Sequence, residues 1–312
     1  VENICMKYAC GCTVHTATKP ALPLAKSIAS ASVLAQVITA KFLYHLPLNR
    51  QEEMWESQEV PLSRKTAAGW LAGVAGLCDP LYRELKAHVF ASKVLGTDDT
   101  SVKVLDRSLD YARTGRLWPH CGDAQHPGVV FNYTQTRGAA DALEFLKEFR
   151  GYLQADAYSV YDQLFKQPSR GVIEIGCWAH ARRYLLKAVD SDKDFSGPAL
   201  WLVNQLYEVE ERARDATAGQ RHQYRQKFSR PLLKKIEEHL DKYRLLVLPK
   251  SPAADAIRYL TNQWEALNRY CDDGELSIDN NATERSLRRV AIGRRNWMFF
   301  GSDVGGHTAA VL

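Results

Sequence analysis

The first part of the chain places its apolar residues at helical spacing. Between residues 30 and 92 they recur every three or four positions, which predicts a series of amphipathic helices. Ser30 precedes the first of these helices, and Pro47 ends it. Three more helices are expected over residues 50–56, 64–71 and 81–91. Ser63 can cap the helix over 64–71, and two short helices joined by a tight turn are typical of a helix-turn-helix.

Beyond residue 92 the pattern changes to short apolar and β-branched runs, which predict buried strands. The expected strands cover residues 94–105, 115–118, 129–133, 152–156 and 172–177. A helix is expected over residues 138–149, ended by Gly151. This alternation predicts an α/β fold with a mixed sheet, and it resembles the ribonuclease-H-like arrangement that many nucleases and transposases use.

A mostly helical block interrupts the α/β pattern. Its helices are expected over residues 200–214, 220–243 and 253–271. A further helix then carries Glu284 and is expected to end near Gly293. The sequence predicts an irregular segment over residues 1–25 and a helical region with the helix-turn-helix over 26–92. A ribonuclease-H-like domain follows over residues 93–196 and 272–312, and a helical insertion over 197–271 interrupts it.

Composition narrows the class of protein. A length of 312 residues allows two or more domains, and a net charge of +5 suits a polyanionic partner. No apolar run reaches the roughly 18 residues of a membrane span, and no signal peptide is visible. Seven mostly isolated cysteines indicate a reducing cytosol. The opening at Val1 and the close at Leu312, without a final element, are consistent with a fragment.

Three carboxylates could carry the chemistry. Asp98 and Asp156 lie in apolar runs, where an unpaired carboxylate is costly, although single acids are more often solvated surface groups. Together with Glu284 they could hold two Mg²⁺ or Mn²⁺ ions, and such sites cut and join phosphodiester bonds. Asp99 is the rival to Asp98, since adjacent strand residues point to opposite faces.

Basic residues gather near these acids and on the helix-turn-helix. An arginine cluster follows Glu284 and would meet phosphates if it is more than a solvated face: Arg285, Arg288, Arg289, Arg294 and Arg295. Arg64 and Lys65 lie on the expected exposed face of the helix that Ser63 caps. A recognition helix would place them in the major groove, whereas a simple helical bundle would leave them solvated.

Several runs, taken together and in order, resemble the insertion-sequence "sixty-six" transposase family. They are residues 45–52, 98–100, 153–158, 176–183, 279–285 and 293–297. The resemblance implies a DDE transposase whose catalytic, metal-binding acids are Asp98, Asp156 and Glu284. The long gap before Glu284 is similar to that of transposases with a helical insertion. It also implies DNA contacts by His180, Arg182 and Arg183, and binding of the transposon end by the helix-turn-helix.

The same resemblance implies partners and a location. These are transposon-end and target DNA, further copies of the chain in a synaptic complex, and small accessory proteins of the same element. A cytoplasmic, nucleoid-associated protein follows, with no membrane partner.

Two other functions stay open. His180 and Arg183 fit the His-x-x-Arg pattern of tyrosine recombinases, which use a covalent tyrosine without metal, but nothing singles out one of 14 tyrosines. A non-enzymatic or decayed DNA-binding fragment is the other. No phosphate-binding loop, dinucleotide fingerprint or serine-hydrolase elbow is present in the sequence, which argues against those enzyme classes.

The first cysteines are weak candidates for a metal site. Cys5, Cys10, Cys12 and His15 could supply zinc ligands, and relatives in the family carry a zinc-binding segment built from Cys-x-x-Cys pairs. Here the spacing between Cys10 and Cys12 is one residue shorter. We therefore expect reduced, unliganded cysteines, and the segment over residues 1–25 as at most a remnant of such a region.

Overall fold

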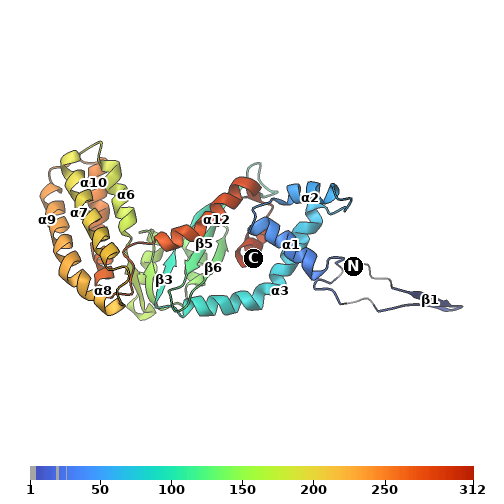
Figure 1. Ribbon diagram of the computed structural model, residues 1–312. Helices are drawn as coiled ribbons and strands as arrows, with labels where there is room; N and C mark the ends of the chain where they lie inside the picture. The colour runs from blue at the N-terminus through green and yellow to red at the C-terminus, as the bar shows by residue number, and fades with distance from the viewer. Residues whose placement is uncertain (1–4, 19–20, 26) are drawn as a thin grey trace.

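A computed structural model describes residues 5–18, 21–25 and 27–312. The parts of the predicted segments 1–25 and 26–92 that fall on residues 1–4, 19–20 and 26 lie outside the described residues. Figure 1 shows a helical block at one end, a sheet in the centre, and helices α1, α2 and the start of α3 at the other end. Helix α12 crosses the sheet between these two ends.

The central sheet has seven strands. Its strands are β3 (Val94–Thr97), β4 (Thr100–Val104), β5 (Arg113–Cys121), β6 (Val129–Thr134), β7 (Gly151–Gln154), β8 (Val172–Ile175) and β9 (Phe299–Phe300). Strands β3 and β4 pair with β5 in a single register, because Thr97 faces His120 and Thr100 faces Leu117. They therefore act as one strand that is interrupted at residues 98–99.

The strand directions place the carboxyl ends of two neighbouring strands, β3 and β7, next to each other. Strands β3, β7 and β8 run parallel, β9 runs parallel to β4, and β5 is antiparallel to β3, β4 and β6. The carboxyl ends of β3 and β7 therefore lie side by side. The sheet thus contains both parallel and antiparallel neighbours, as the sequence predicted.

Two strand predictions were wrong in length. The run over 94–105 is broken at Asp98 and Asp99, where the chain leaves the ladder. Strand β5 covers nine residues rather than the four predicted over 115–118. Its outer positions are polar, so the hydrophobic pattern did not reveal them, but pairing with strands on both sides holds them extended.

The core of the sheet packs around large buried side chains. Leu95, Trp118 and Leu153 belong to one apolar cluster, together with residues of α4 (Ala139–Phe145) and Phe149. The Trp118 indole N–H donates to Thr134 Oγ1 at 2.8 Å, so this buried donor is satisfied. Helix α4 is shorter than the predicted 138–149 because the chain turns at Leu146.

The helices before the sheet form a small domain-like cluster. They are α1 (Ala31–Phe42), α2 (Leu48–Glu56) and α3 (Arg64–Phe90). Val37, Leu62, Ala67 and Leu71 form their buried core. Gln51 is buried with them, and its amide donates to the carbonyl oxygens of α1 and of the turn that follows it at 3.3 and 2.9 Å.

Helix α3 corrects the prediction of two separate helices over 64–71 and 81–91. It runs unbroken for 27 residues, with Pro80 inside it. The buried face continues from Ala67 through Leu71 to Ala75, so packing carries the helix past the proline that the sequence indicated as a boundary. The helix-turn-helix candidate therefore consists of α2 and the first turns of α3.

The helical block lies between β8 and α12. Its helices are α6 (Trp178–Ala188), α7 (Lys193–Arg212), α8 (Ala218–Tyr224), α9 (Arg230–Tyr243), α10 (Pro252–Asn262) and α11 (Trp264–Asn268), and α5 (Asp162–Phe165) precedes β8. A π-helical turn joins α8 and α9. Helix α7 begins seven residues before the predicted Leu200, because the Asp192 side chain caps it at Phe195. The buried Arg225 pairs with Glu210 and ties these helices together.

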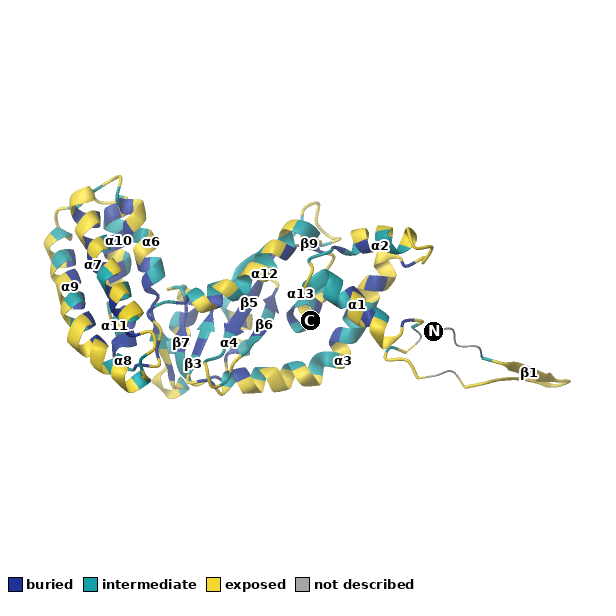
Figure 2. Ribbon diagram, in the orientation of Figure 1, coloured by how far each residue is buried: buried dark blue, intermediate teal, exposed yellow. Residues whose placement is uncertain are grey.

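Three end segments complete the chain. Strands β1 (Lys7–Cys10) and β2 (Thr13–Thr16) form a hairpin, exposed along its length, where an irregular segment was predicted (Figure 2). Threonine, valine and tyrosine favour this extended pairing. Helix α12 (Asn281–Trp297) continues past Gly293, which is buried, and ends at Met298 with a φ of 58°. Helix α13 (Asp303–Val311) packs on β6 and α3. No helix of the described chain is long and apolar enough to cross a membrane.

Candidate active site

The site lies where β3 and β7 end side by side. Val94 pairs with Tyr152 and Gly96 with Gln154, an offset of 58 residues. The same offset, carried two residues further, places Asp98 opposite Asp156. Neighbouring strands lie about 4.8 Å apart, so the two carboxylates project from adjacent backbones. Asp156 follows the end of β7 rather than lying within the predicted strand over 152–156.

Asp98 is a half-buried carboxylate without a cationic partner among the described residues. Its Oδ1 accepts the backbone N–H of Asp99 at 2.7 Å. Burial raises the pKa of Asp98 to about 7, and the negative charges of Asp156 and Glu284 contribute to this rise. The ionised form of Asp98 is therefore disfavoured by burial and by the nearby negative charges.

Asp99 has a different role from its neighbour. Its side chain is 4% exposed and forms ion pairs with Arg116 at 2.7 Å and Arg137 at 2.8 Å. Two guanidinium groups thus satisfy its buried charge, as a buried carboxylate requires. Between the two rival aspartates, only Asp98 keeps its carboxylate free for a ligand.

Asp156 shares the electrostatic environment of Asp98. Burial raises its pKa to about 6, the carboxylate of Asp99 adds to the rise, and Arg137 opposes it. Glu284 also raises the pKa of Asp156. The charge of Glu284 thus raises the pKa values of both Asp98 and Asp156, so these three acids, which are far apart in the sequence, lie near one another in space.

Glu284 reaches this site because the start of α12 is fixed to β3. The Asn280 side-chain amide donates to the Thr97 carbonyl oxygen at 2.8 Å. Thr283 lies directly on Gly96, where a Cβ atom would come within 2.1 Å of its hydroxyl oxygen. A glycine is therefore needed at position 96 for the helix to approach the strand.

Two basic residues of α6 contact the Glu284 carboxylate. Arg183 donates to its Oε1 atom, and His180 Nε2 lies 3.8 Å from the same atom. Arg183 also contacts His180 Nε2 at 3.0 Å. The structure thus brings the sequence-predicted His180 and Arg183 to the third acid, where the Arg183 guanidinium balances its charge. Burial lowers the pKa of His180, which favours its neutral form.

The donor chemistry of the three acids fits a hard divalent cation. All are carboxylate oxygens, the ligands that Mg²⁺ and Mn²⁺ prefer, and a cation would favour the ionised forms of Asp98 and Asp156, whose pKa values burial raises. Their positions are less closely gathered than a metal demands. Within residues 5–18, 21–25 and 27–312, no three acidic, histidine or cysteine side chains converge closely enough to hold a metal ion. Glu284 would have to exchange Arg183 for such an ion.

Of the predicted arginine cluster, one side chain is hydrogen-bonded to β4 and the others are exposed. Arg294 donates to Thr100 Oγ1 at 2.7 Å and to the Ser101 carbonyl at 2.8 Å, so it braces α12 against β4. Arg182 contacts Asn204 Oδ1 at 3.3 Å. The remaining members are exposed and have no acidic partner in the described part of the chain: Arg285, Arg288, Arg289 and Arg295.

The basic residues of the helix-turn-helix candidate lie elsewhere. Arg64 and Lys65 are exposed at the start of α3, and the Arg64 guanidinium lies 3.8 Å from Glu52. Figure 1 places the start of α3 beside α2, away from the strand ends that carry the acids. The structure therefore does not bring these two residues to the carboxylate site.

Sequence reasoning missed the residues that hold the site in place. Asn280 and Thr283 fix α12 to β3, and Arg137 neutralises Asp99. The first two belong to the run Asp279–Arg285, where only the acid was singled out. Arg137 lies in a loop before α4 and has no sequence signal that distinguishes it from a solvated arginine.

The cysteines at the exposed hairpin lie close to one another. Cys10 Sγ is 3.6 Å from Cys12 Sγ, and Thr13 links Cys10 to His15 through contacts of 3.4 and 3.2 Å. Hydrogen bonds from Thr13 and Cys12 lower the pKa of the Cys10 thiol to about 7. Neither of these two cysteines forms a disulfide bond in the structure.

Comparison with known proteins defines the class of this chain. Residues 26–308 match the family described as "Transposase IS66 family", and the chain belongs to that family. It is similar to three proteins of Sinorhizobium fredii (strain NBRC 101917 / NGR234), each described as an uncharacterized protein: y4jD, y4hP and y4qI, at 32%, 30% and 29% identity. These alignments cover 98%, 100% and 96% of this chain but 63%, 60% and 58% of the relatives. The chain thus spans about three fifths of the length of these relatives.

Proposed function

We propose that this chain carries the metal-dependent DNA cleavage and strand-transfer site of a DDE transposase, built on a ribonuclease-H-like sheet. The observation that carries the proposal is that three acids from separate elements lie near one another at the carboxyl ends of β3 and β7. Asp98 follows β3, Asp156 follows the adjacent parallel strand, and Glu284 stands on the helix fixed to β3. The mixed sheet with one antiparallel inner strand supports the fold assignment.

Each acid has an expected role. Asp98 and Asp156 would hold the two Mg²⁺ or Mn²⁺ ions between them, and Glu284 would complete the second site. When bound, the ions would polarise the scissile phosphate and activate the attacking oxygen. The side chains of the protein provide the orientation: carboxylates fixed at strand ends, and arginines that meet phosphate oxygens along the strand.

The reaction follows from phosphodiester chemistry. Water would attack phosphorus, the bond to the 3′ oxygen would break, and that oxygen would leave as a hydroxyl. The freed 3′-hydroxyl would then attack a phosphodiester of the target DNA, so that one bond forms as another breaks. The exposed arginines of α12 (Arg285, Arg288, Arg289 and Arg295) are placed to orient the scissile strand.

Recombination through a tyrosine finds no support in the site. Arg183 and His180 contact Glu284 rather than a tyrosine. Where tyrosine pKa values are shifted, burial raises them, in Tyr82, Tyr133, Tyr161, Tyr207, Tyr259 and Tyr270. A nucleophilic tyrosine would need activation in the opposite direction.

The proposed partners follow from the reaction. They are transposon-end DNA, bound through α2 and the start of α3 with Arg64 and Lys65, and target DNA. Joining two ends calls for a second copy of the chain in a synaptic complex, and small accessory proteins of the element would act with it. The proposed location is the cytoplasm, at the nucleoid when DNA is bound.

The test is cleavage of a labelled duplex that carries an end of the element, with Mg²⁺ or Mn²⁺ present. Asp98→Asn, Asp156→Asn and Glu284→Gln should each lower the cleavage rate by about a thousandfold or more, with duplex binding retained, while the exposed-acid control Asp110→Asn should not. Full cleavage by all three variants would overturn the proposal. Specific binding without any metal-dependent cleavage by the wild-type protein would indicate a DNA-binding remnant.

A further inference from the structure

Arg137 contacts residues next to both aspartates of the candidate site. Its guanidinium pairs with Asp99, the residue after Asp98, at 2.8 Å. The same guanidinium lies 3.9 Å from the centre of the Tyr158 ring, and Tyr158 follows Asp156 by two residues. One side chain thus joins the chain segment of the first acid to that of the second.

Two contacts connect Arg137 with Tyr158. The Tyr158 hydroxyl donates to the Arg137 carbonyl oxygen at 2.8 Å, and the guanidinium lies over the ring, whose face attracts a cation. The ring also packs against the buried Trp118, with centroids 6.2 Å apart and planes inclined by 26°. Tyr158 is therefore fixed both to the core of the sheet and to Arg137.

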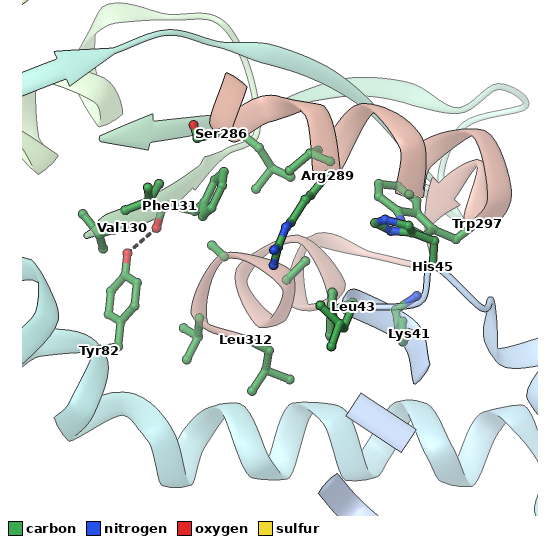
Figure 3. Close-up of a pocket in the computed structure, with 18 of the residues that line it drawn as sticks. Lys41, Leu43, His45, Tyr82, Val130, Phe131, Ser286, Arg289, Trp297 and Leu312 are labelled. Carbon is green, nitrogen blue, oxygen red and sulfur yellow. Dashed lines mark hydrogen bonds between the residues drawn. The ribbon is translucent and has the colours of Figure 1, made fainter. Parts of the chain in front are cut away.

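The loop that carries Arg137 starts from a fixed strand. It follows β6, which pairs with β5 along its length. Figure 3 shows the Tyr82 hydroxyl of α3 directed at the Phe131 carbonyl of β6, to which it donates. Beyond the strand, the Thr136 hydroxyl accepts the Gly138 N–H at 3.1 Å and closes a turn around Arg137. The arginine thus extends towards the aspartates from a hydrogen-bonded backbone.

The charge of Asp99 alone does not explain this arrangement. Arg116 pairs with the same carboxylate at 2.7 Å and is the less exposed of the two arginines. In the described part of the chain, Arg116 has no hydrogen bond or ion pair with residues 155–161, whereas Arg137 reaches Tyr158. The link from Asp99 to the segment of Asp156 therefore depends on Arg137.

We propose that Arg137 is a positioning residue, which fixes Asp156 beside Asp98 by tying the segment after β7 to the break between β3 and β4. The inference rests on the proposed function of these acids. Two ligands of one ion must keep a set separation, and the residues that orient ligands commonly determine metal affinity. Arg137 holds the two strand ends together in the metal-free protein, so that an ion meets two carboxylates already in place.

Hydrogen exchange of the metal-free chain tests this link without metal or DNA. The Tyr161 N–H donates to the Tyr158 carbonyl at 3.0 Å, so its exchange reports on the segment that Arg137 holds. In Arg137→Gln the peptide containing Tyr161 should exchange about fivefold faster by mass spectrometry, the factor for losing one contact of this kind. Arg116→Gln removes the other ion pair of Asp99 and should stay within about twofold of wild type.

Manganese affinity separates positioning from a plain effect of charge. Arg137 lies near Asp156, since its positive charge lowers the pKa of that carboxyl. Removing a positive charge beside a cation site strengthens cation binding, whereas loss of an orienting residue weakens it by about ten- to a hundredfold. Arg137→Gln should therefore bind Mn²⁺ about tenfold more weakly in calorimetry, with Asp156→Asn giving the background. Partial unfolding would lower the fraction of chains that bind, not the affinity of the folded ones.

A change on the other side of the contact tests whether Arg137 acts through Tyr158. Tyr158→Leu keeps an apolar side chain against Trp118 but removes the ring face and the hydroxyl that contact Arg137. This variant should also bind Mn²⁺ more weakly than wild type. The double variant should stay within about twofold of Arg137→Gln alone, because both changes remove the same contact.

Three results would overturn the inference and leave the proposed function standing. They are unchanged exchange in Arg137→Gln, unchanged or tighter Mn²⁺ binding by that variant, and losses that add fully in the double variant. A wild-type chain that binds no Mn²⁺ above the Asp156→Asn background would overturn the proposed function, and the inference with it.

Discussion

At the scale of single residues, we expect the Arg183–Glu284 ion pair to control whether Glu284 can bind a metal ion. The guanidinium and carboxylate are bonded in the structure, and both are partly exposed. Arg183→Gln should release Glu284 and raise Mn²⁺ affinity in the absence of DNA about fivefold, the factor for an ion pair worth about 1 kcal/mol. Titration calorimetry measures this change.

The adjacent arginine provides the control for that change. Arg182 points to Asn204 and has no contact with Glu284, so Arg182→Gln should leave Mn²⁺ affinity within twofold of wild type. An unchanged or lower affinity in Arg183→Gln would show that the pair does not compete with the ion.

A second residue-scale prediction concerns stability in acid. His120 is 2% exposed, stacks on Phe145 with ring centroids 4.8 Å apart, and neither ring nitrogen has a hydrogen-bond partner among the described residues. Burial lowers its pKa to about 3. The unfolded chain binds a proton near pH 6.5 and the folded chain does not. Stability is therefore lost as pH falls below 6.5 towards 3.

His120→Phe should remove this loss. Between pH 6.5 and 4.5 the wild-type protein should lose about 2–3 kcal/mol more unfolding free energy than the variant, as measured by urea unfolding. Changing the exposed His15 to alanine should leave the pH dependence of wild type intact. Parallel curves for wild type and His120→Phe would contradict the assignment.

At the scale of elements, the approach of α12 to β3 is the contact that builds the site. A Cβ at Gly96 would lie 2.1 Å from Thr283 Oγ1 and 3.0 Å from Asn280 Oδ1. Gly96→Ala should therefore push the helix start away, lower the unfolding free energy by about 1–3 kcal/mol and reduce metal-dependent cleavage.

Gly69 offers the matched comparison for an alanine in place of glycine. It is exposed within α3, and nothing lies within 4 Å of an added Cβ. Gly69→Ala should raise the unfolding free energy by up to about 1 kcal/mol, because alanine favours a helix, and leave cleavage unchanged. If Gly96→Ala behaved like Gly69→Ala, the close packing of α12 on β3 would not be required.

Elements also show where sequence reasoning succeeded and where it failed. The change from helical to strand periodicity near residue 92 was visible, and strands and helices were found in the right order. Pro80 suggested a helix end, but tertiary packing kept α3 continuous. Gly293 suggested the end of the helix that carries Glu284, but α12 continues past it. The absence of a side chain at Gly293 allows Trp297 and His45 to pack closely against the helix.

The candidate site was predictable in part, for a physical reason. Alternation along a strand cannot say which of Asp98 and Asp99 faces the site, because that depends on Arg116 and Arg137 from other segments. The Arg183–Glu284 pair joins residues 101 positions apart, which no local pattern reveals. The family resemblance, rather than the local pattern, indicated the three candidate acids.

At the scale of the whole molecule, we expect the exposed basic residues to mark an extended path for the proposed DNA. Arg64 and Lys65 lie at the start of α3, and the exposed arginines of α12 lie over the sheet between the two ends of the molecule. Binding should therefore weaken steeply with salt. Arg288→Gln and Arg295→Gln should each reduce the slope of log affinity against log salt by about 1.

The helical block supplies the comparison for this salt dependence. Arg214 is exposed there and pairs with Glu211, so Arg214→Gln should leave the slope unchanged. Anisotropy titrations over a series of salt concentrations give the slope for the wild-type chain and for each of the three variants. Equal slopes for wild type and both α12 variants would place the DNA away from that helix.

The central claim is that Asp98, Asp156 and Glu284 form one divalent-metal site. The most direct measurement is anomalous diffraction at the manganese edge from crystals of the protein grown with an end-containing duplex and Mn²⁺. The predicted result is manganese density bonded to the Asp98 and Asp156 carboxylates, with Glu284 released from Arg183 and turned towards it. Manganese bound only elsewhere, with the Arg183–Glu284 pair intact, would contradict the claim.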